Sequence, residues 1–272
     1  MGRITSRHKV VRIDLDHGAT TRVETVAVEE PLEIRIGDEV LTVTMRTPGH
    51  DLELAHGLLL AEGIITARED VLTARYCVDT TELNVLQLQL REAAGVPATA
   101  QRRLIAHGGC GLCGKTSIDA IAESPVYDAT ALTGNDFRVD AGRIAQLPDL
   151  LRAGQDVFDR TGGVHAAGLF GASGEALVIR EDIGRHNAVD KVTGWAVLQE
   201  HPTAECIAMV SSRASFEIVQ KVAMAGIPVL ACVSAPSSLA IQAADRLGVT
   251  LIAYTRGRRM TMCSHPDRVL LP

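Results

Sequence analysis

Two cysteines separated by two residues form the segment of this chain best suited to chemistry. Cys110 and Cys113 lie in the glycine-rich stretch 107–115, just ahead of a helical pattern that begins near Ser117. A position before a helix start and a lysine two residues after Cys113 both favour the thiolate, which is the reactive form of cysteine. The flanking glycines leave the backbone free, so a sulfur held here can swing between partners. The segment therefore predicts a carrier thiol.

Three other chemistries use the same spacing. A structural zinc site needs a second Cys or His pair, and zinc is disfavoured because the other cysteines are solitary: Cys77, Cys206, Cys232 and Cys263. A thioredoxin-like redox pair stays open, although its flanking strand and Trp-Cys context are missing. A zinc-dependent nucleobase deaminase also needs His-x-Glu. None of the nine histidines is followed two positions later by glutamate, which excludes deamination.

The bulk composition is that of an acidic globular protein. The 272 residues are 46% hydrophobic, and a net charge of -6 argues against general binding of nucleic acid or anionic membranes. No apolar run approaches the roughly 20 residues of a spanning helix. The basic N-terminus is not followed by the apolar core of a signal peptide, so we expect a cytoplasmic location and no disulfide framework.

The first part of the chain is expected to be rich in strands. Short β-branched or alternating segments bounded by turn formers predict strands at residues 9–16, 23–28, 32–36, 40–45 and 83–90. One helix is predicted over residues 51–62. Its inward face is expected to carry Leu52, Ala55, Leu58 and Leu59.

The last part predicts an α/β fold. Apolar strands at 206–210, 229–233 and 250–254 alternate with helices at 215–225 and 238–247, the pattern of a parallel sheet covered by helices. Ahead of them we expect helices within 141–159, a strand pair at 164–170 and 176–179, and a helix at 187–199. The segment 141–159, as one helix or two, should bury Leu147, Leu150, Leu151 and Val157. We divide the chain into residues 1–103, 104–163 and 164–272.

Three loops should meet where the parallel strands end, because ligands of open α/β sheets bind beyond the carboxyl ends of the strands. They are residues 211–213, 234–238 and 255–259. The first two lead into helix N-termini, which favour anions, although their serines can equally be ordinary N-caps. Arg256, Arg258 and Arg259 favour phosphate or a nucleotide. No dinucleotide or Walker-type motif accompanies them.

Two further polar clusters leave alternatives open. Residues 181–191 combine many ionisable side chains in one strand-to-helix turn. They are either surface ion pairs around a capped helix or a site in which Arg185 or His186 faces the reactive sulfur or a cofactor. His165 is similar, since a histidine in an apolar strand is more often satisfied in the core than catalytic.

Several segments together resemble the formate dehydrogenase accessory sulfurtransferase family, FdhD. They are residues 57–64, 108–114, 161–167, 181–191, 211–225, 233–240 and 258–265, in the order of that family. The resemblance implies a cytidine-deaminase-like fold and a homodimer. It also implies a sulfurtransferase that takes sulfur from a cysteine desulfurase and delivers it to the molybdenum cofactor, bis(molybdopterin guanine dinucleotide), of formate dehydrogenase.

The resemblance also assigns the site. Cys110 corresponds to the cysteine that carries the persulfide and Cys113 to its companion. The nucleotide-binding segment corresponds to Tyr254, Thr255, Arg256, Gly257, Arg258 and Arg259. Cys263 departs from the family, which often has an aromatic residue there, so a third thiol near the site stays open. The alternative function is a non-catalytic chaperone that binds the cofactor for the apo-dehydrogenase.

Overall fold

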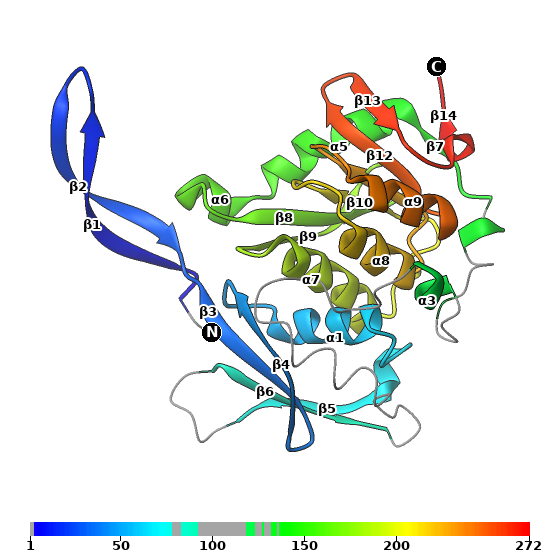
Figure 1. Ribbon diagram of the computed structural model, residues 1–272, viewed down its shortest axis with the longest axis horizontal. Coiled ribbons are helices and arrows are strands. Elements are labelled where there is room, and N and C mark those ends of the chain that lie inside the picture. The colour runs from blue at the N-terminus through cyan, green and yellow to red at the C-terminus, as the bar shows by residue number, and fades with distance from the viewer. Residues whose placement is uncertain (1–2, 78–82, 92–117, 123–126, 128–131, 135) are drawn as a thin grey trace.

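A computed structural model describes residues 3–77, 83–91, 118–122, 127, 132–134 and 136–272 (Figure 1). Its central feature is a six-stranded sheet with the order β13-β12-β11-β10-β8-β9. The strands are β8 (His165–Phe170), β9 (Ala176–Asp182), β10 (Ile207–Val210), β11 (Val229–Cys232), β12 (Thr250–Arg256) and β13 (Arg259–Met262). Strands β10, β11 and β12 run parallel, as predicted, whereas β8, β9 and β13 are antiparallel to their neighbours.

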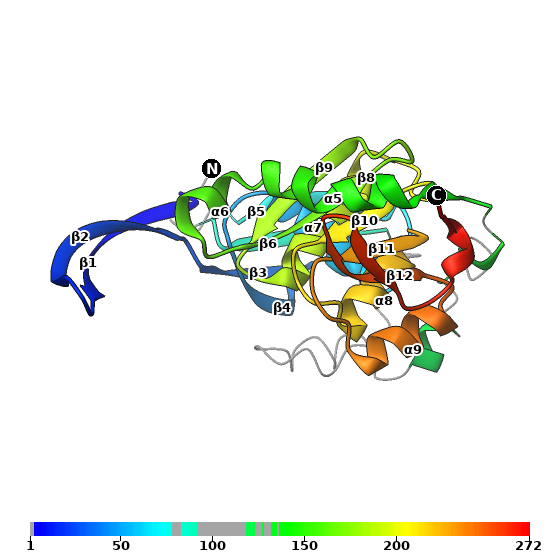
Figure 2. The same cartoon turned by 90° about the horizontal axis from the view of Figure 1, so that it is seen from above.

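Helices cover both faces of this sheet (Figure 2). Helix α5 (Ala141–Ala153) lies on one face, and α7 (Arg185–Leu198), α8 (Phe216–Met224) and α9 (Ser238–Arg246) lie on the other. Successive side chains of a strand point to opposite faces. Ile207 and Met209 of β10 therefore pack in the cluster that holds α5, while Ala208 and Val210 pack in the cluster that holds α7 and α8.

A second, smaller sheet lies beside the first. Its order is β4-β3-β6-β5, formed by β3 (Glu30–Ile36), β4 (Glu39–Arg46), β5 (Val71–Tyr76) and β6 (Val85–Leu90). Helix α1 (Asp51–Ala61) is packed between this sheet and α7, and Leu54 and Leu59 join the core of the small sheet. Glycines at positions 57 and 194 let α1 and α7 cross with their backbones in contact.

The chain begins with a hairpin that projects from this body. Strands β1 (Thr5–Asp14) and β2 (Gly18–Ala27) pair along their whole length and extend away from the rest of the protein (Figures 1 and 2). The remaining short elements are η1 (Arg68–Asp70), α3 (Ile118–Ala122), β7 (Val139–Asp140), α6 (Asp156–Thr161), η2 (Pro266–Arg268) and β14 (Val269–Leu270). No helix among the described residues is both long and apolar enough to cross a membrane.

The expected α/β layering and β-rich N-terminal part are confirmed, but two predicted helix faces are partly wrong. Leu52 of α1 is 39% exposed and Leu150 of α5 is 40% exposed, although both were expected to point inward. Helix α1 is buried between a sheet and another helix, so apolar and small residues occur around most of its circumference. A single apolar stripe therefore could not identify its inner face.

Candidate anion-binding site

The three predicted loops meet at one edge of the large sheet. The amide of Ala214 donates to the carbonyl of Ala235 at 3.2 Å, and the amide of Ser237 donates to the carbonyl of Ala214 at 3.0 Å. The amide of Tyr254 donates to the carbonyl of Ser234 at 3.1 Å. Because β10, β11 and β12 are parallel, their carboxyl ends share this edge, and the expected convergence is confirmed.

Three helices begin at the same edge, and their caps differ. At α9, the Ser237 hydroxyl accepts from the amide of Ala240 at 3.1 Å, so this serine is an ordinary N-cap. At α8, the Ser215 side chain makes no capping hydrogen bond, and its Oγ lies 3.4 Å from Nε2 of His186. At α7 the N-cap is Gly184, which has no side chain to offer. The starts of α7 and α8 therefore keep amides without a side-chain cap, as an anion site requires.

The segment that carries the arginines is a hairpin, which corrects the predicted loop at 255–259. Thr255 and Arg256 continue β12, and the chain returns as β13, with left-handed backbone at Tyr254 and Gly257. The pairing shifts register between Ala253 and Arg256, the position of a bulge. Sequence reasoning missed β13 because its four residues, RMTM, lack the apolar run that marked the other strands.

The hairpin divides its side chains between solvent and core. Tyr254 is 52% exposed, and the arginines at 256, 258 and 259 are exposed as well. Thr255 is completely buried, and its Oγ1 is one of two buried side-chain atoms without a hydrogen-bond partner among the described residues. An unpartnered buried hydroxyl is costly, so this edge holds one donor whose hydrogen bond is not satisfied within the described residues.

Two half-buried histidines complete the edge. The pKa of His186 is lowered to about 4, mainly by burial and also by the nearby cations Lys221 and Arg185, while Glu217 opposes the shift. Burial, with Arg185 as a second cause, also lowers the pKa of His165, which lies at the start of β8. Both rings are therefore neutral near pH 7. Positive charge at this edge comes from arginines, while the imidazoles supply neutral donors and acceptors.

Three members of the motif at residues 181–191 make buried contacts that hold helix α7 in place. Asp182 and Lys191 form a buried ion pair at 2.7 Å, and Lys191 Nζ also donates to the carbonyl of Thr47 at 2.9 Å. Asn187 Nδ2 donates to Asp182 Oδ1 at 3.1 Å. These three side chains fix the start of α7 to the segment before α1, so their role is structural. The expected surface ion pairs around a capped helix are nevertheless wrong, because the pair is buried and the N-cap is Gly184. The signal for this role was weak, because a buried Lys-Asp pair has the same sequence appearance as a surface pair.

Comparison with known proteins decides the family. The chain matches the FdhD/NarQ family over residues 27–270. The chain belongs to the FdhD/NarQ family. A sulfur carrier protein FdhD from Nocardia farcinica is 50% identical, with 98% of this chain and 96% of that protein covered. Another from Mycobacterium tuberculosis is 48% identical over 99% of this chain and 100% of that protein.

A solved structure agrees with this membership. It comes from Desulfotalea psychrophila, is described as that of a formate dehydrogenase accessory protein, and superposes with a TM-score of 0.78. The two chains are 25% identical, and the match covers 98% of this chain and 100% of the other. The resemblance seen in the sequence is therefore confirmed at the level of the FdhD/NarQ family.

The two cysteines of the FdhD-like motif, Cys110 and Cys113, lie outside the described residues. Among the described thiols, burial raises the pKa of Cys206 and of Cys232 to about 11. Burial also raises the pKa of Cys263, which disfavours a third thiolate at the site. No cluster of three or more His, Cys, Asp or Glu side chains in the described part of the chain could hold a metal ion.

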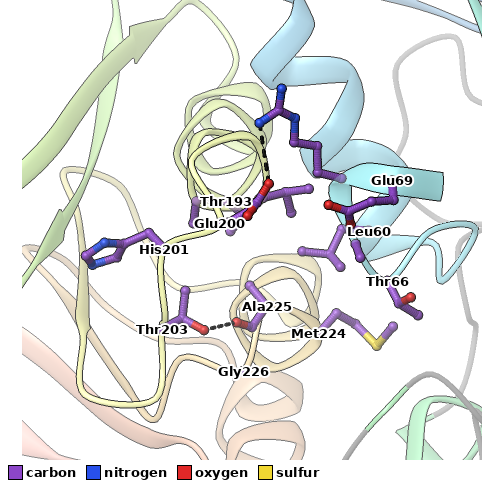
Figure 3. A pocket seen from close by; sticks show the side chains of 14 residues that line it. Leu60, Thr66, Glu69, Thr193, Glu200, His201, Thr203, Met224, Ala225 and Gly226 are labelled. Atoms are coloured by element: carbon purple, nitrogen blue, oxygen red, sulfur yellow. Dashed lines mark hydrogen bonds and ion pairs between the residues drawn. The ribbon is translucent and has the colours of Figure 1, made fainter. Parts of the chain in front are cut away.

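A cavity of about 370 Å³ lies at the other end of α7 and α8, between their last turns and that of α1 (Figure 3). Arg68 and Glu200 form an exposed ion pair beside it at 3.4 Å. Helix α7 has 14 residues and is therefore about 21 Å long. This cavity is thus separate from the candidate anion-binding site at the helix starts.

Proposed function

We propose that this chain is a sulfurtransferase of the FdhD type, a persulfide carrier that works as a homodimer with the cytidine-deaminase-like fold implied by its family. It accepts sulfur from a cysteine desulfurase and delivers it to the molybdenum cofactor of formate dehydrogenase. Full-length similarity to sulfur carrier proteins supports the sulfur chemistry. The observation that carries the cofactor half is the edge where uncapped helix starts and an arginine hairpin meet.

The loading step transfers one neutral sulfur atom. The Cys110 thiolate attacks the terminal sulfur of the desulfurase persulfide, and a new S–S bond forms as the old one breaks. The desulfurase cysteine leaves as a thiolate, and Cys110 becomes a persulfide. No external oxidant or reductant is consumed.

The release step uses the second cysteine. The Cys113 thiolate attacks the inner sulfur of the Cys110 persulfide, which forms a Cys110–Cys113 disulfide and expels the outer sulfur as sulfide. Two thiols are oxidised to a disulfide while the sulfur is reduced to sulfide, so the electrons balance. A cellular thiol reductant then restores the pair for the next cycle.

The client cofactor enters this scheme as a substrate. Its guanine-nucleotide phosphates would bind the arginines at 256, 258 and 259, whose planar donor forks match phosphate oxygens. The amides at the starts of α7 and α8 would supply further donors. Tyr254 exposes its ring at the same place, and Gly257 gives the turn its left-handed backbone.

Intact-mass analysis tests the sulfur half. The full-length protein is incubated with a cysteine desulfurase and cysteine, and we expect an adduct of about 32 Da, one sulfur atom, that a thiol reductant removes. The Cys110→Ala variant should not form it, whereas Cys77→Ala, which removes a half-buried thiol elsewhere, should. If Cys110→Ala still loads sulfur, the carrier assignment is wrong. If it does not load yet still activates formate dehydrogenase, the chaperone alternative replaces the carrier.

A further inference from the structure

The N-terminal arm, defined as the β1–β2 hairpin, makes few contacts with its own body. Its two strands of ten residues pair from Thr5 opposite Ala27 to Asp14 opposite Gly18, a length of about 30 Å. Contacts to the body lie at its base, where Arg160 Nη2 of α6 donates to the Thr5 hydroxyl at 2.7 Å. The match to the family starts at residue 27, where the arm ends.

The arm exposes more apolar surface than a free hairpin should. Val11 is 62% exposed, Ile13 70% and Leu15 97%, and no described part of the chain covers them. A lone two-stranded hairpin is marginally stable in water, because it lacks a third layer against which to bury side chains. An arm of this length needs a surface to lie on.

The register divides the arm into two different faces. The basic-apolar face carries Arg7, Lys9, Val11 and Ile13 of β1 together with Ala19, Thr21, Val23 and Thr25 of β2. It contains no acidic residue. The opposite face has charges of both signs, and Arg22 and Glu24 pair with each other on it. The basic-apolar face therefore combines basic side chains, which have no acidic partner on that face, with exposed apolar side chains. This combination fits an acidic partner surface.

The charge distribution identifies a partner. The arm, residues 5–27, contains four basic and three acidic side chains, whereas the whole chain contains 27 basic and 33 acidic ones. The body without the arm therefore has 23 basic and 30 acidic side chains. The arm projects away from its own acidic body (Figures 1 and 2). A second copy of this chain presents the same acidic body to it, and complementary charge favours that encounter.

We infer that the basic-apolar face of the arm docks on the acidic body of a second copy, and that two exchanged arms hold the dimer together. This inference rests on the homodimer in the proposed function and names its surface. It is independent of the sulfur chemistry. A two-fold exchange is self-complementary, because each copy contributes one arm and one acceptor body.

Sedimentation equilibrium of matched variants tests the inference. The wild-type full chain should have twice the mass of the 29.0 kDa monomer. Ile13→Asp puts a carboxylate on the basic-apolar face and should raise the dimer dissociation constant about tenfold or more, since a charge would be buried without a partner. Thr20→Asp puts the same carboxylate on the opposite face, beside Arg12, and should leave the constant within about twofold.

Charge reversal and hydrogen exchange supply independent readouts. Lys9→Glu should weaken the dimer, and added salt should weaken the wild type but affect this variant less. Amides of β1 and β2 should exchange slowly in the dimer and quickly after dissociation. A monomeric wild type, or equal effects of Ile13→Asp and Thr20→Asp, would overturn the inference. Arm protection that arises only when apo-formate dehydrogenase is added would overturn it too and would identify the client as the partner.

The two proposals fail in distinguishable ways. Ile13→Asp should still take up sulfur from the desulfurase, because the arm is not part of the transfer chemistry. A dimer that depends on the arm but never takes up sulfur would contradict the carrier function and would support the inference about the arm. A monomer that takes up sulfur normally would support the carrier function and would contradict the inference about the arm.

Discussion

Gly194 of α7 faces Gly57 of α1 at a crossing where neither position has room for a side chain. A Cβ built on Gly194 would lie 2.7 Å from the backbone nitrogen of Gly57 and would overlap the carbonyl of Glu53. A Cβ on Gly57 would overlap the carbonyl of Asp190. This crossing joins the small sheet to the large one, because α1 covers the former and α7 the latter.

Gly194→Ala should therefore destabilise the fold, in spite of the higher helix propensity of alanine. The added methyl must push two helix backbones apart, and we expect a loss of about 3 kcal/mol in the free energy of unfolding by urea. Gly163→Ala serves as the control, since its nearest neighbours lie 3.8 Å or more away, and it should change stability by less than about 0.5 kcal/mol. Equal stability of the two variants would contradict the close crossing.

Lys191→Met should be one of the most damaging polar changes in the chain. It removes the cation from a pair with Asp182 in which both side chains are almost fully buried, and it leaves the carboxylate without its partner charge. We expect a loss of about 3 to 5 kcal/mol. Arg152→Ala breaks an exposed pair with Asp159 and should cost no more than about 1 kcal/mol. Chemical denaturation of both variants measures the contrast.

His186 should make the fold sensitive to mild acid. Its pKa falls from the usual 6.5 to about 4 in the folded chain. Between pH 6.5 and pH 4, the unfolded chain therefore binds a proton at this ring more readily than the folded chain does. Stability from this residue is present above pH 6.5 and is lost as the pH falls towards 4, by up to about 3 kcal/mol. Unfolding free energies measured from pH 7 to pH 4 should therefore decline less in His186→Gln than in the wild type.

The difference between the two proteins isolates His186, because other titrating groups such as His165 and Asp190 remain in both. Parallel curves for wild type and His186→Gln would show that the ring is not held neutral.

Arg258→Ala combined with Arg259→Ala should weaken nucleotide binding. Guanosine diphosphate is the probe, and calorimetry should show an affinity lower by about tenfold or more, because charged hydrogen bonds to phosphate are lost. Added salt should weaken the wild-type complex, since the arginines are exposed. Arg75→Ala, on the exposed surface of the small sheet, should bind as the wild type does. Unchanged affinity in the double variant would remove the hairpin from the proposed site.

The sequence predicts the edge where the parallel strands end better than it predicts the contacts that support this edge. Three short apolar runs with intervening helices suffice to identify β10, β11 and β12, and parallel strands necessarily bring their loops together. The buried role of Lys191 depends on contacts with Thr47, which lies 144 residues away, and no local pattern contains that contact. The N-terminal arm was predictable only in its secondary structure. Its strands follow from β-branched residues, but its projection from the body is a tertiary property.

Thr255→Val should separate stability from binding at the proposed site. The Thr255 hydroxyl is fully buried without a hydrogen-bond partner among the described residues. Valine has nearly the same shape and removes the unsatisfied group, so the free protein should be unchanged or more stable by about 1 kcal/mol. If the hydroxyl contacts the bound nucleotide, the affinity for guanosine diphosphate should fall several-fold in the same variant.

Thr193→Val is the matched control, because its hydroxyl is equally buried but donates within α7 to the carbonyl of Val189 at 3.2 Å. That variant loses a hydrogen bond and should be less stable by about 1 kcal/mol, with nucleotide affinity unchanged. Thermal unfolding and calorimetry on both variants give four values. A stabilised Thr255→Val that binds as tightly as the wild type would mean that the nucleotide makes no use of this hydroxyl. A destabilised one would mean that the hydroxyl already has a partner in the free protein.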